Sequence, residues 1–380
     1  MKEQQNHESL FSLFLTFLRF GFLAWGGPVA QIAMIKDELV DQKNWISQEK
    51  FKRALAIYQA LPGPEAHELC VYFGMIRRGR WGGFLAGLGF MLPGFVLMIL
   101  FSYLYVTFGA VTLLPLFAGV APAVSALITR AAHRLATHIL HDKSLIAVGI
   151  ISVILTLCQM NFIWVFLICI LSRSLWLKNK KTTIAIIFPA LIILVFSANH
   201  LSSGPSFSSS GNLFIEGLKA GLLSFGGAYT AMPFLQNSMV GNYAGITTNS
   251  FLDGIALANV IPAPLVIFGT YLGFLAGSFS GALLITIGIF LPAFSFTLLG
   301  HKYLEKLIEN KTFHGLLDSI SAAVFGILLV TALQIFLHTV TSTLSALIFI
   351  IALAGFYFLK WRWSTPLIII CCGFLGYFLI

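Results

Sequence analysis

Charged residues are scarce in this chain of 380 residues. Only 10% are Asp, Glu, Lys or Arg and 58% are hydrophobic, whereas an ordinary soluble protein carries about 25% charged residues. The mean hydropathy is +0.91. Long apolar runs exceed what one aqueous core can bury, and the clearest are Gly83–Leu100, Leu145–Leu157, Phe162–Leu171, Ile184–Ala198, Ala282–Leu299 and Leu344–Leu359. The sequence therefore predicts an all-α polytopic membrane protein and excludes a soluble one.

Cysteines and catalytic motifs are also few. No disulfide framework and no CxxC metal motif is formed by the five scattered cysteines, which are Cys70, Cys158, Cys169, Cys371 and Cys372. The chain has no HExxH, no GxSxG, no paired-Asp motif and no soluble domain that could supply chemistry. We therefore expect no enzymatic activity, no cofactor and no metal.

The basic residues are grouped rather than spread. The formal charge is +9, which could suggest nucleic acid, but Lys and Arg stand in short clusters between apolar segments. Such clusters are typical of the cytoplasmic loops of a membrane protein. They are Arg77/Arg78/Arg80, Arg130/Arg134, Lys178/Lys180/Lys181 and Lys302/Lys306/Lys311. The polar start Met1–Leu10 precedes an apolar run without a small-residue cleavage site, which favours a first membrane element over a removed signal peptide.

The chain repeats itself at an offset of about 200 residues. Glycines and prolines match in register, which is hard to obtain by chance from two apolar sequences. At an offset of 200, Gly21, Gly26, Gly27, Pro62 and Pro64 match Gly221, Gly226, Gly227, Pro262 and Pro264, and at 199, Gly74, Gly82, Gly89 and Pro93 match Gly273, Gly281, Gly288 and Pro292. The sequence thus divides into halves at residues 1–200 and 201–380, joined by the Ser-rich loop Asn199–Asn212.

Equivalent loops of the two halves differ in charge. Lys36–Arg53 holds five Lys or Arg, while its partner Gln236–Phe251 holds none. Further along the bias reverses, because Phe101–Thr112 is neutral and its partner His301–Thr312 carries three lysines. Since Lys and Arg mark cytoplasmic loops, the halves are predicted to face opposite ways. This arrangement is an inverted-topology repeat, a recurring plan of secondary transporters.

Four segments inside apolar stretches cannot continue a helix, because proline lacks an amide donor and glycine favours turns. Each break can expose a helix N-terminus, whose free amides and partial positive charge attract anions. The alternative is that the prolines only kink helices and the glycines only permit close packing. On the functional interpretation the substrate-binding candidates are Gly26, Gly27, Pro28, Pro62, Gly63, Pro64, Gly226, Gly227, Asn259, Pro262, Ala263 and Pro264.

The charge pattern favours re-entrant hairpins at these breaks. Basic loops flank Ala54–Met75 on both sides, so that segment enters and leaves on one face. By symmetry the same is expected of Leu10–Ile35 and Leu213–Leu235. Five crossings are then predicted in the first half, at about 82–100, 114–130, 144–160, 161–177 and 183–198. The alternative, in which every segment crosses, places the loops Lys36–Arg53 and Arg77–Arg80 on opposite faces.

Ionisable side chains near the breaks are candidates for proton coupling, since such groups are costly inside a membrane. These candidates are Glu65, His67, Glu68 and Asp253. Glu65 could instead cap a half-helix through the helix dipole. Arg19 and Lys219 occupy equivalent places before the Gly-Gly pairs. Either they supply charge to an anion site or they extend to the membrane interface.

At these motifs the sequence resembles the chromate ion transporter family in its long form with two fused halves. The resemblance runs from about residue 10 to 337 and rests on Gly26-Gly27-Pro28, Gln31–Met34, Trp45-Ile46-Ser47, Leu61–Ala66, Gly74, Trp81-Gly82-Gly83, Leu92-Pro93, Phe225–Tyr229, Leu252-Asp253-Gly254 and Pro262-x-Pro264. It implies a multi-pass protein of the cytoplasmic (inner) membrane that exports chromate, a dianion similar to sulfate, driven by the proton gradient or the membrane potential. Its expected partners are the oxyanion and the lipid bilayer, with no nucleic acid, and a homodimer is left open beside a monomer.

Two departures from the family's pattern bear on the cargo. Ala263 stands where the family usually has glycine, and His67 and Glu68 stand where it usually has neutral residues. An added methyl narrows the backbone approach, and an added carboxylate disfavours a dianion nearby. The alternatives are a transporter of another inorganic or organic anion, an intramembrane enzyme and a non-conducting membrane subunit.

Overall fold

The computed structural model describes residues 9–176, 210–225, 228–308, 311–359, 361 and 363–379. Within these ranges the chain forms helices and no strand, apart from one isolated β-bridge. The elements are α1 (Leu10–Phe22), α2 (Gly27–Ile35), the π-helix η1 (Lys36–Gln42), α3 (Gln48–Ala60), α4 (Glu65–Ile139), α5 (Lys143–Leu157), α6 (Phe162–Trp176), α8 (Ser210–Leu223), η2 (Ala228–Thr230), α9 (Ala231–Met239), α10 (Thr248–Val260), η3 (Leu265–Ile267), α11 (Phe268–Ile308), α12 (Lys311–Thr339), α13 (Thr343–Phe358) and α14 (Ser364–Leu379).

Membrane-compatible helices account for much of this architecture. Among the described residues, three helical stretches are long and apolar enough to cross a bilayer: Glu65–Phe108, Leu265–Gly300 and Gly315–Thr339. Large apolar side chains such as Ile150, Leu337 and Ile350 are exposed on the outer helices, where lipid rather than water is their natural surrounding. The predicted all-α polytopic membrane fold is confirmed.

Helices stop where the sequence predicted breaks. α1 ends at Phe22 and α2 begins at Gly27, with Gly26 and Gly27 both at positive φ (86° and 77°). α3 ends before Pro62-Gly63-Pro64, and α10 ends before Pro262-Ala263-Pro264. The fourth predicted break, Gly226-Gly227, lies outside the described residues.

Each half contains a tight helical hairpin at the same place in the repeat. A Cβ built on Gly74 would lie 2.3 Å from the carbonyl oxygen of Gly82, although a straight helix would hold these residues a full two turns apart. The chain therefore folds back between them, at Gly79 with φ +62°. In the second half, a Cβ on Gly273 would lie 2.5 Å from the oxygen of Gly281, and the reversal falls at Gly277–Ser278.

In each half, the helical segment that follows the hairpin packs closely on the helix that begins that half. A Cβ on Gly89 of α4 would lie 2.9 Å from the carbonyl oxygen of Phe14 in α1. Its counterpart Gly288 in α11 would place a Cβ 2.4 Å from the oxygen of Phe214 in α8. The internal repeat read from the sequence is thus present as repeated backbone contacts. The inverted orientation of the halves across the membrane stays a prediction.

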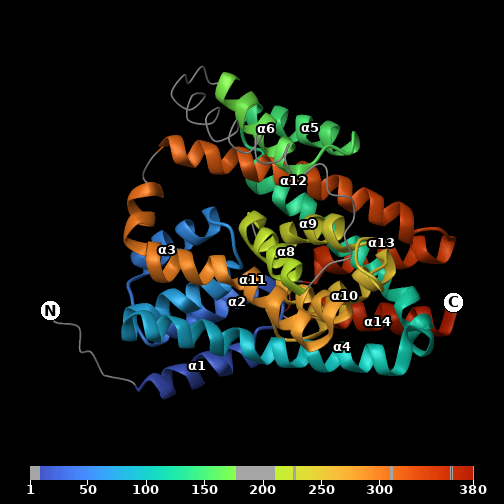
Figure 1. Cartoon of the computed structure of the whole chain (residues 1–380), viewed down its shortest axis with the longest axis horizontal. Helices are drawn as coiled ribbons and strands as arrows, with labels where there is room; N and C mark the ends of the chain where they lie inside the picture. Colours follow the sequence, from blue (N-terminus) through green and yellow to red (C-terminus); the bar gives the residue numbers. More distant parts are fainter. Residues whose placement is uncertain are drawn as a thin grey trace.

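The late helices of each half pack on the other half. α12 lies against α5 and α6, while α13 and α14 lie against α4, and Figure 1 shows α12 crossing beside α5 and α6. The Ser152 hydroxyl of α5 donates to the Ala323 carbonyl of α12 at 2.5 Å. Tyr357 of α13 is hydrogen-bonded to His133 of α4 at 2.6 Å. The halves are therefore interlocked.

One sequence expectation needs correction. Arg130 and Arg134, expected in a cytoplasmic loop, lie in α4, which is helical up to Ile139. The expected crossings at 82–100 and 114–130 both lie in α4, which changes direction in Figure 1. Arg173, within the expected crossing at 161–177, is buried in α6 and paired with Asp318 at 3.3 Å. The predicted crossing at 183–198 lies outside the described residues.

Candidate anion site

The helix breaks of the two halves meet each other. Pro62 and Phe225 form an antiparallel β-bridge, and the Gly63 amide donates to the Ser224 carbonyl at 3.2 Å. Backbone groups freed where a helix stops must find partners when buried in a membrane protein. Here part of that requirement is met by pairing one half with the other.

A buried glutamine joins the other pair of breaks. The Gln31 side-chain amide donates 2.9 Å bonds to the carbonyls of both Ala24 and Ala263. Gln31 is 1% exposed, so these bonds form away from water and help to fix the distance between the two breaks. Gln31 is one of the positions on which the family resemblance rests, and it had no assigned role in the sequence.

Little space remains between these breaks. A cavity of about 10 Å³ is bordered by Gly26, Gly27, Asn259 and Ala263, which is at the lower limit for one water molecule. The Asn259 amide is engaged with the Ile255 carbonyl at 2.8 Å. The Ala263 methyl lies against Gly94, since a Cβ built on Gly94 would come within 2.3 Å of it. The Ala263 methyl is therefore accommodated by a glycine opposite it.

A larger cavity lies beside the first break. Its volume is about 300 Å³, at the lower end of the range for small-molecule sites. Three helix starts border it: Pro28 in the first turn of α2, Glu65 at the start of α4, and Thr230 just before α9. Free amides at helix starts make their surroundings favourable to anions. Residues in or just after three of the four predicted breaks thus border this cavity, and binding of an anion there stays a prediction.

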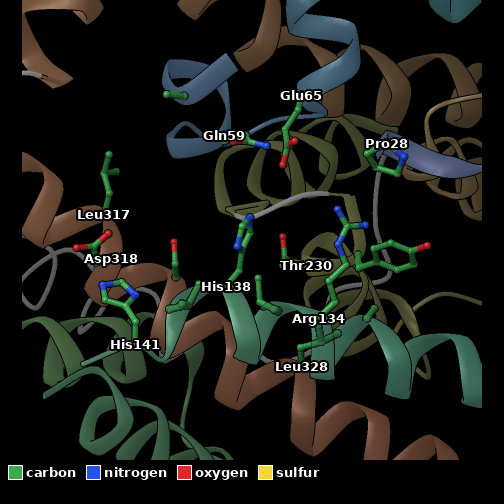
Figure 2. Close-up of a pocket in the computed structure, with 16 residues that line it drawn as sticks. Pro28, Gln59, Glu65, Arg134, His138, His141, Thr230, Leu317, Asp318 and Leu328 are labelled. Carbon is green, nitrogen blue, oxygen red and sulfur yellow. The ribbon is translucent and has the colours of Figure 1, made fainter. Parts of the chain in front are cut away.

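Basic side chains line the opposite wall. Arg134 and His138 project from the end of α4 toward Glu65 at its beginning, while His141, just beyond α4, lies beside Asp318 (Figure 2). The Gln59 side-chain amide lies beside the Glu65 carboxylate. Asp318 also borders the cavity, but Arg173 neutralises it. None of the ion pairs among the described residues includes Arg134. Its guanidinium therefore remains available, and its planar fork matches a tetrahedral oxyanion well.

Sequence reasoning missed these basic residues. Arg134 was interpreted as a topology marker, and His138 and His141 were given no role. Arg134 and His138 stand at i and i+4, which places them on one face of α4, and that spacing was the signal that could have identified them. It was hidden because the segment was taken to be a loop.

Two coupling candidates near the first break lie away from the cavity wall. His67 is fully buried, with its ring between those of Phe290 and Phe294 at centroid distances of 4.9 and 4.7 Å. Both carboxylate oxygens of Glu68 are buried without a hydrogen-bond partner among the described residues. They lie against Gly63, where a Cβ would be 2.9 Å from Oε1 of Glu68. An ionised carboxylate is costly in such a place, which favours a protonated Glu68.

The fourth candidate, Asp253, has a different setting. It is 6% exposed and accepts a 2.7 Å hydrogen bond from the Tyr105 hydroxyl. The Tyr105 ring in turn packs edge-on against Tyr271 at 5.3 Å. Asp253 is not among the residues that border the cavity of Arg134. Of the four coupling candidates, only Glu65 is.

Arg19 and Lys219 supply no charge to this cavity. Their side chains are 55% and 50% exposed, and they form ion pairs with Glu38 and Glu216, respectively. Neither borders the cavity. Of the two roles that the sequence left open, extension to the surface is the one observed.

Apolar helices interrupted at breaks, with a charged cavity beside them, are the architecture of membrane transporters. The chain belongs to the chromate transporter family, which it matches over residues 11–173 and 211–377. That family comprises transporters, so the expectation that the protein is not an enzyme is confirmed.

Relatives match along nearly the whole chain. The sequence is 43% identical to a chromate transport protein of Pseudomonas aeruginosa, over 96% of this chain and 91% of the relative. It is 28% identical to a chromate transport protein of Cupriavidus metallidurans, over 97% and 92%. An uncharacterized transporter of Methanocaldococcus jannaschii is 27% identical over 100% and 96%. No solved structure matches the chain.

Proposed function

We propose that the protein exports chromate through the cavity bordered by Arg134 and Glu65. The supporting observation is that three helix starts and one guanidinium outside any ion pair face a single space. Charge-assisted hydrogen bonds from a guanidinium and from backbone amides are the strongest that a protein offers an oxyanion. The names of the two relatives in Pseudomonas and Cupriavidus supply chromate as the specific cargo.

Glu65 is the group that couples cargo to protons in this mechanism. Its carboxylate and a bound dianion would share one small cavity, and two like charges at close range disfavour each other. We expect Glu65 to be protonated while the dianion is bound, and ionised and attracted to Arg134 after the dianion leaves. The Glu65 proton would be released on the same side as the dianion, so one proton and one dianion would move in the same direction in each cycle, which makes flux sensitive to the proton gradient.

Direction follows from the charge bias. The end of α4, where Arg134 projects, belongs to the segment that the Lys and Arg distribution predicts to be cytoplasmic. A cavity accessible from that side would load cytoplasmic anion, and the result is export across the cytoplasmic membrane. Sulfate has the same charge and shape, so a site built on these contacts would also accept it or exchange it for chromate.

The test is flux in proteoliposomes with imposed pH gradients and potentials. Wild-type protein should move chromate and sulfate, and Arg134→Gln should lower the flux about 100-fold, the loss expected when a charge-assisted pair worth roughly 3 kcal/mol is removed. Arg80→Gln, at an exposed arginine outside the cavity, is the matched control and should leave flux unchanged. If wild-type protein moves neither anion, or if Arg134→Gln transports normally, the proposal is wrong.

A further inference from the structure

A second cavity, of about 530 Å³, lies at the far end of α9 and α12. Hydroxyl and amide side chains from several helices border it, including Gln159, Asn161, Gln236, Asn237, Thr331 and Gln334. None of the described residues that border it is Asp, Glu, Lys, Arg or His. It is therefore polar but uncharged, in contrast to the cavity of Arg134.

The two cavities approach each other closely. On α12, Leu328 borders the first and its neighbour Ile327 borders the second. At α9 the first reaches Thr230 and the second reaches Pro233, one helical turn further on. The residues between, Ala231 and Met232, are completely buried. Buried residues that span about one helical turn thus separate the two spaces along α9.

The repeat relates the cavities to each other. α4 ends at Ile139 and α12 ends at Thr339, and the next helices begin at Lys143 and Thr343. In this register, Gln334 of the second cavity stands where Arg134 stands in the first. Equivalent helix ends therefore border both spaces, with a guanidinium in one and a neutral amide in the other.

We propose that the second cavity is the opposite vestibule of the permeation path, and that the layer formed by Thr230–Pro233 and Ile327–Leu328 is the barrier that opens during transport. This inference rests on the proposed function. Conduction requires a site that is attractive enough to load and another that is weak enough to release. Neutral amides hold an oxyanion less tightly than a guanidinium does, which suits the second cavity to release.

Access to thiol reagents tests the geometry independently of flux. In a background with all five cysteines replaced, Gln334→Cys and Ser321→Cys probe the second and first cavities, respectively. A membrane-impermeant maleimide should label Gln334→Cys from one side of sealed vesicles and Ser321→Cys from the other. Asn242→Cys, in the exposed loop after α9, is the control and should be labelled from the same side as Gln334→Cys. Labelling of both probes from one side, or of Asn242→Cys without Gln334→Cys, would overturn the proposal.

A charge placed in the vestibule tests the path itself. Gln334→Glu should lower chromate flux on the order of tenfold, because the new carboxylate repels the dianion in a space of low dielectric. Asn242→Glu, which puts the same charge outside the cavity, should transport like wild type. If wild-type protein moves chromate and Gln334→Glu moves it equally fast, the second cavity is not part of the path, while the proposed function stands. If wild-type protein moves no chromate, the proposed function fails first.

Discussion

The Pro62-Gly63-Pro64 and Pro262-Ala263-Pro264 breaks share a backbone plan but differ in chemistry. The residues that follow the first are Glu65, His67 and Glu68, whereas Leu265, Ile267 and Phe268 occupy the same places after the second. All three apolar residues are at most 3% exposed. The helical hairpins, the breaks and the helix packing are thus present twice, but the ionisable groups after the breaks occur only in the first half.

One helix earlier, it is the second half that carries the buried ionisable residue. Arg53 is exposed and pairs with Glu49, while its counterpart Asp253 is buried against Tyr105. Duplication supplies two copies of a scaffold, and divergence then assigns each copy its own polar groups. Under the proposed function, this asymmetry lets the anion bind more tightly at one end of the path than at the other, which favours loading at the first end and release at the second. The tests below compare equivalent positions in the two halves.

The largest effect is expected where the scaffold is the same in both halves. Gly74→Ala and Gly273→Ala each place a methyl within about 2.5 Å of a facing carbonyl oxygen. Overpacking of this kind lowers the free energy of unfolding by roughly 1–3 kcal/mol. We expect the upper end of that range, because a backbone carbonyl cannot move aside as a side chain can. Thermal unfolding in detergent should show similar losses for both variants. Gly315→Ala, where a Cβ has no neighbour within 4 Å, is the control. A loss confined to one half would show that the hairpins are not equivalent supports.

A second test separates the two carboxylates. Glu65→Gln should abolish the response of chromate flux to an imposed pH gradient, because it removes the titrating group from the cavity. Asp253→Asn should keep that response but unfold more easily by about 0.5–1.5 kcal/mol, since it weakens a buried hydrogen bond. Flux at several gradients and thermal unfolding distinguish these outcomes. If Asp253→Asn loses the pH response and Glu65→Gln retains it, the roles are reversed.

A third test concerns Ala263, where the second break has a methyl that the first lacks, and Gly94, which lies against that methyl. Gly94→Ala should destabilise the protein by about 2 kcal/mol, because its methyl would meet that of Ala263 at 2.3 Å. Ala263→Gly makes room for it, so the double variant should recover most of the loss. Unfolding measurements on the four proteins form a double-mutant cycle with a coupling of about 1–2 kcal/mol. Additive effects would mean that the two methyls do not meet.

The smallest effect is expected at the surface. Arg19→Ala and Lys219→Ala each remove a largely exposed side chain from an ion pair, and such pairs are worth about 0–1 kcal/mol. Both variants should transport chromate at the wild-type rate and unfold within roughly 1 kcal/mol of wild type. A large loss of flux in either one would restore that residue as a ligand of the anion.

Composition and local pattern were enough to predict the membrane fold, three of the four helix breaks and the repeated glycines. These features depend on neighbours in the chain: proline stops a helix wherever it falls within one, and small residues at a fixed spacing permit close helix contact. The same local reasoning placed Arg130 and Arg134 in a loop, because basic residues between apolar runs are typical of loops. The division into halves at 200 and their inverted orientation remain predictions.

Tertiary structure alone decided which distant groups meet. Glu65 and Arg134 face one cavity because α4 folds back at Gly79 and changes direction again before it reaches Arg134. Gln31 reaches Ala263, and Gly63 reaches Ser224, because the two halves are interlocked. Asp253, equal to Glu65 as a candidate in the sequence, is engaged by a tyrosine from another helix. The sequence determined where the backbone must stop being helical, since that depends on a few adjacent residues. Which side chains share a site depends on the packing of helices far apart in the chain, which no local pattern records.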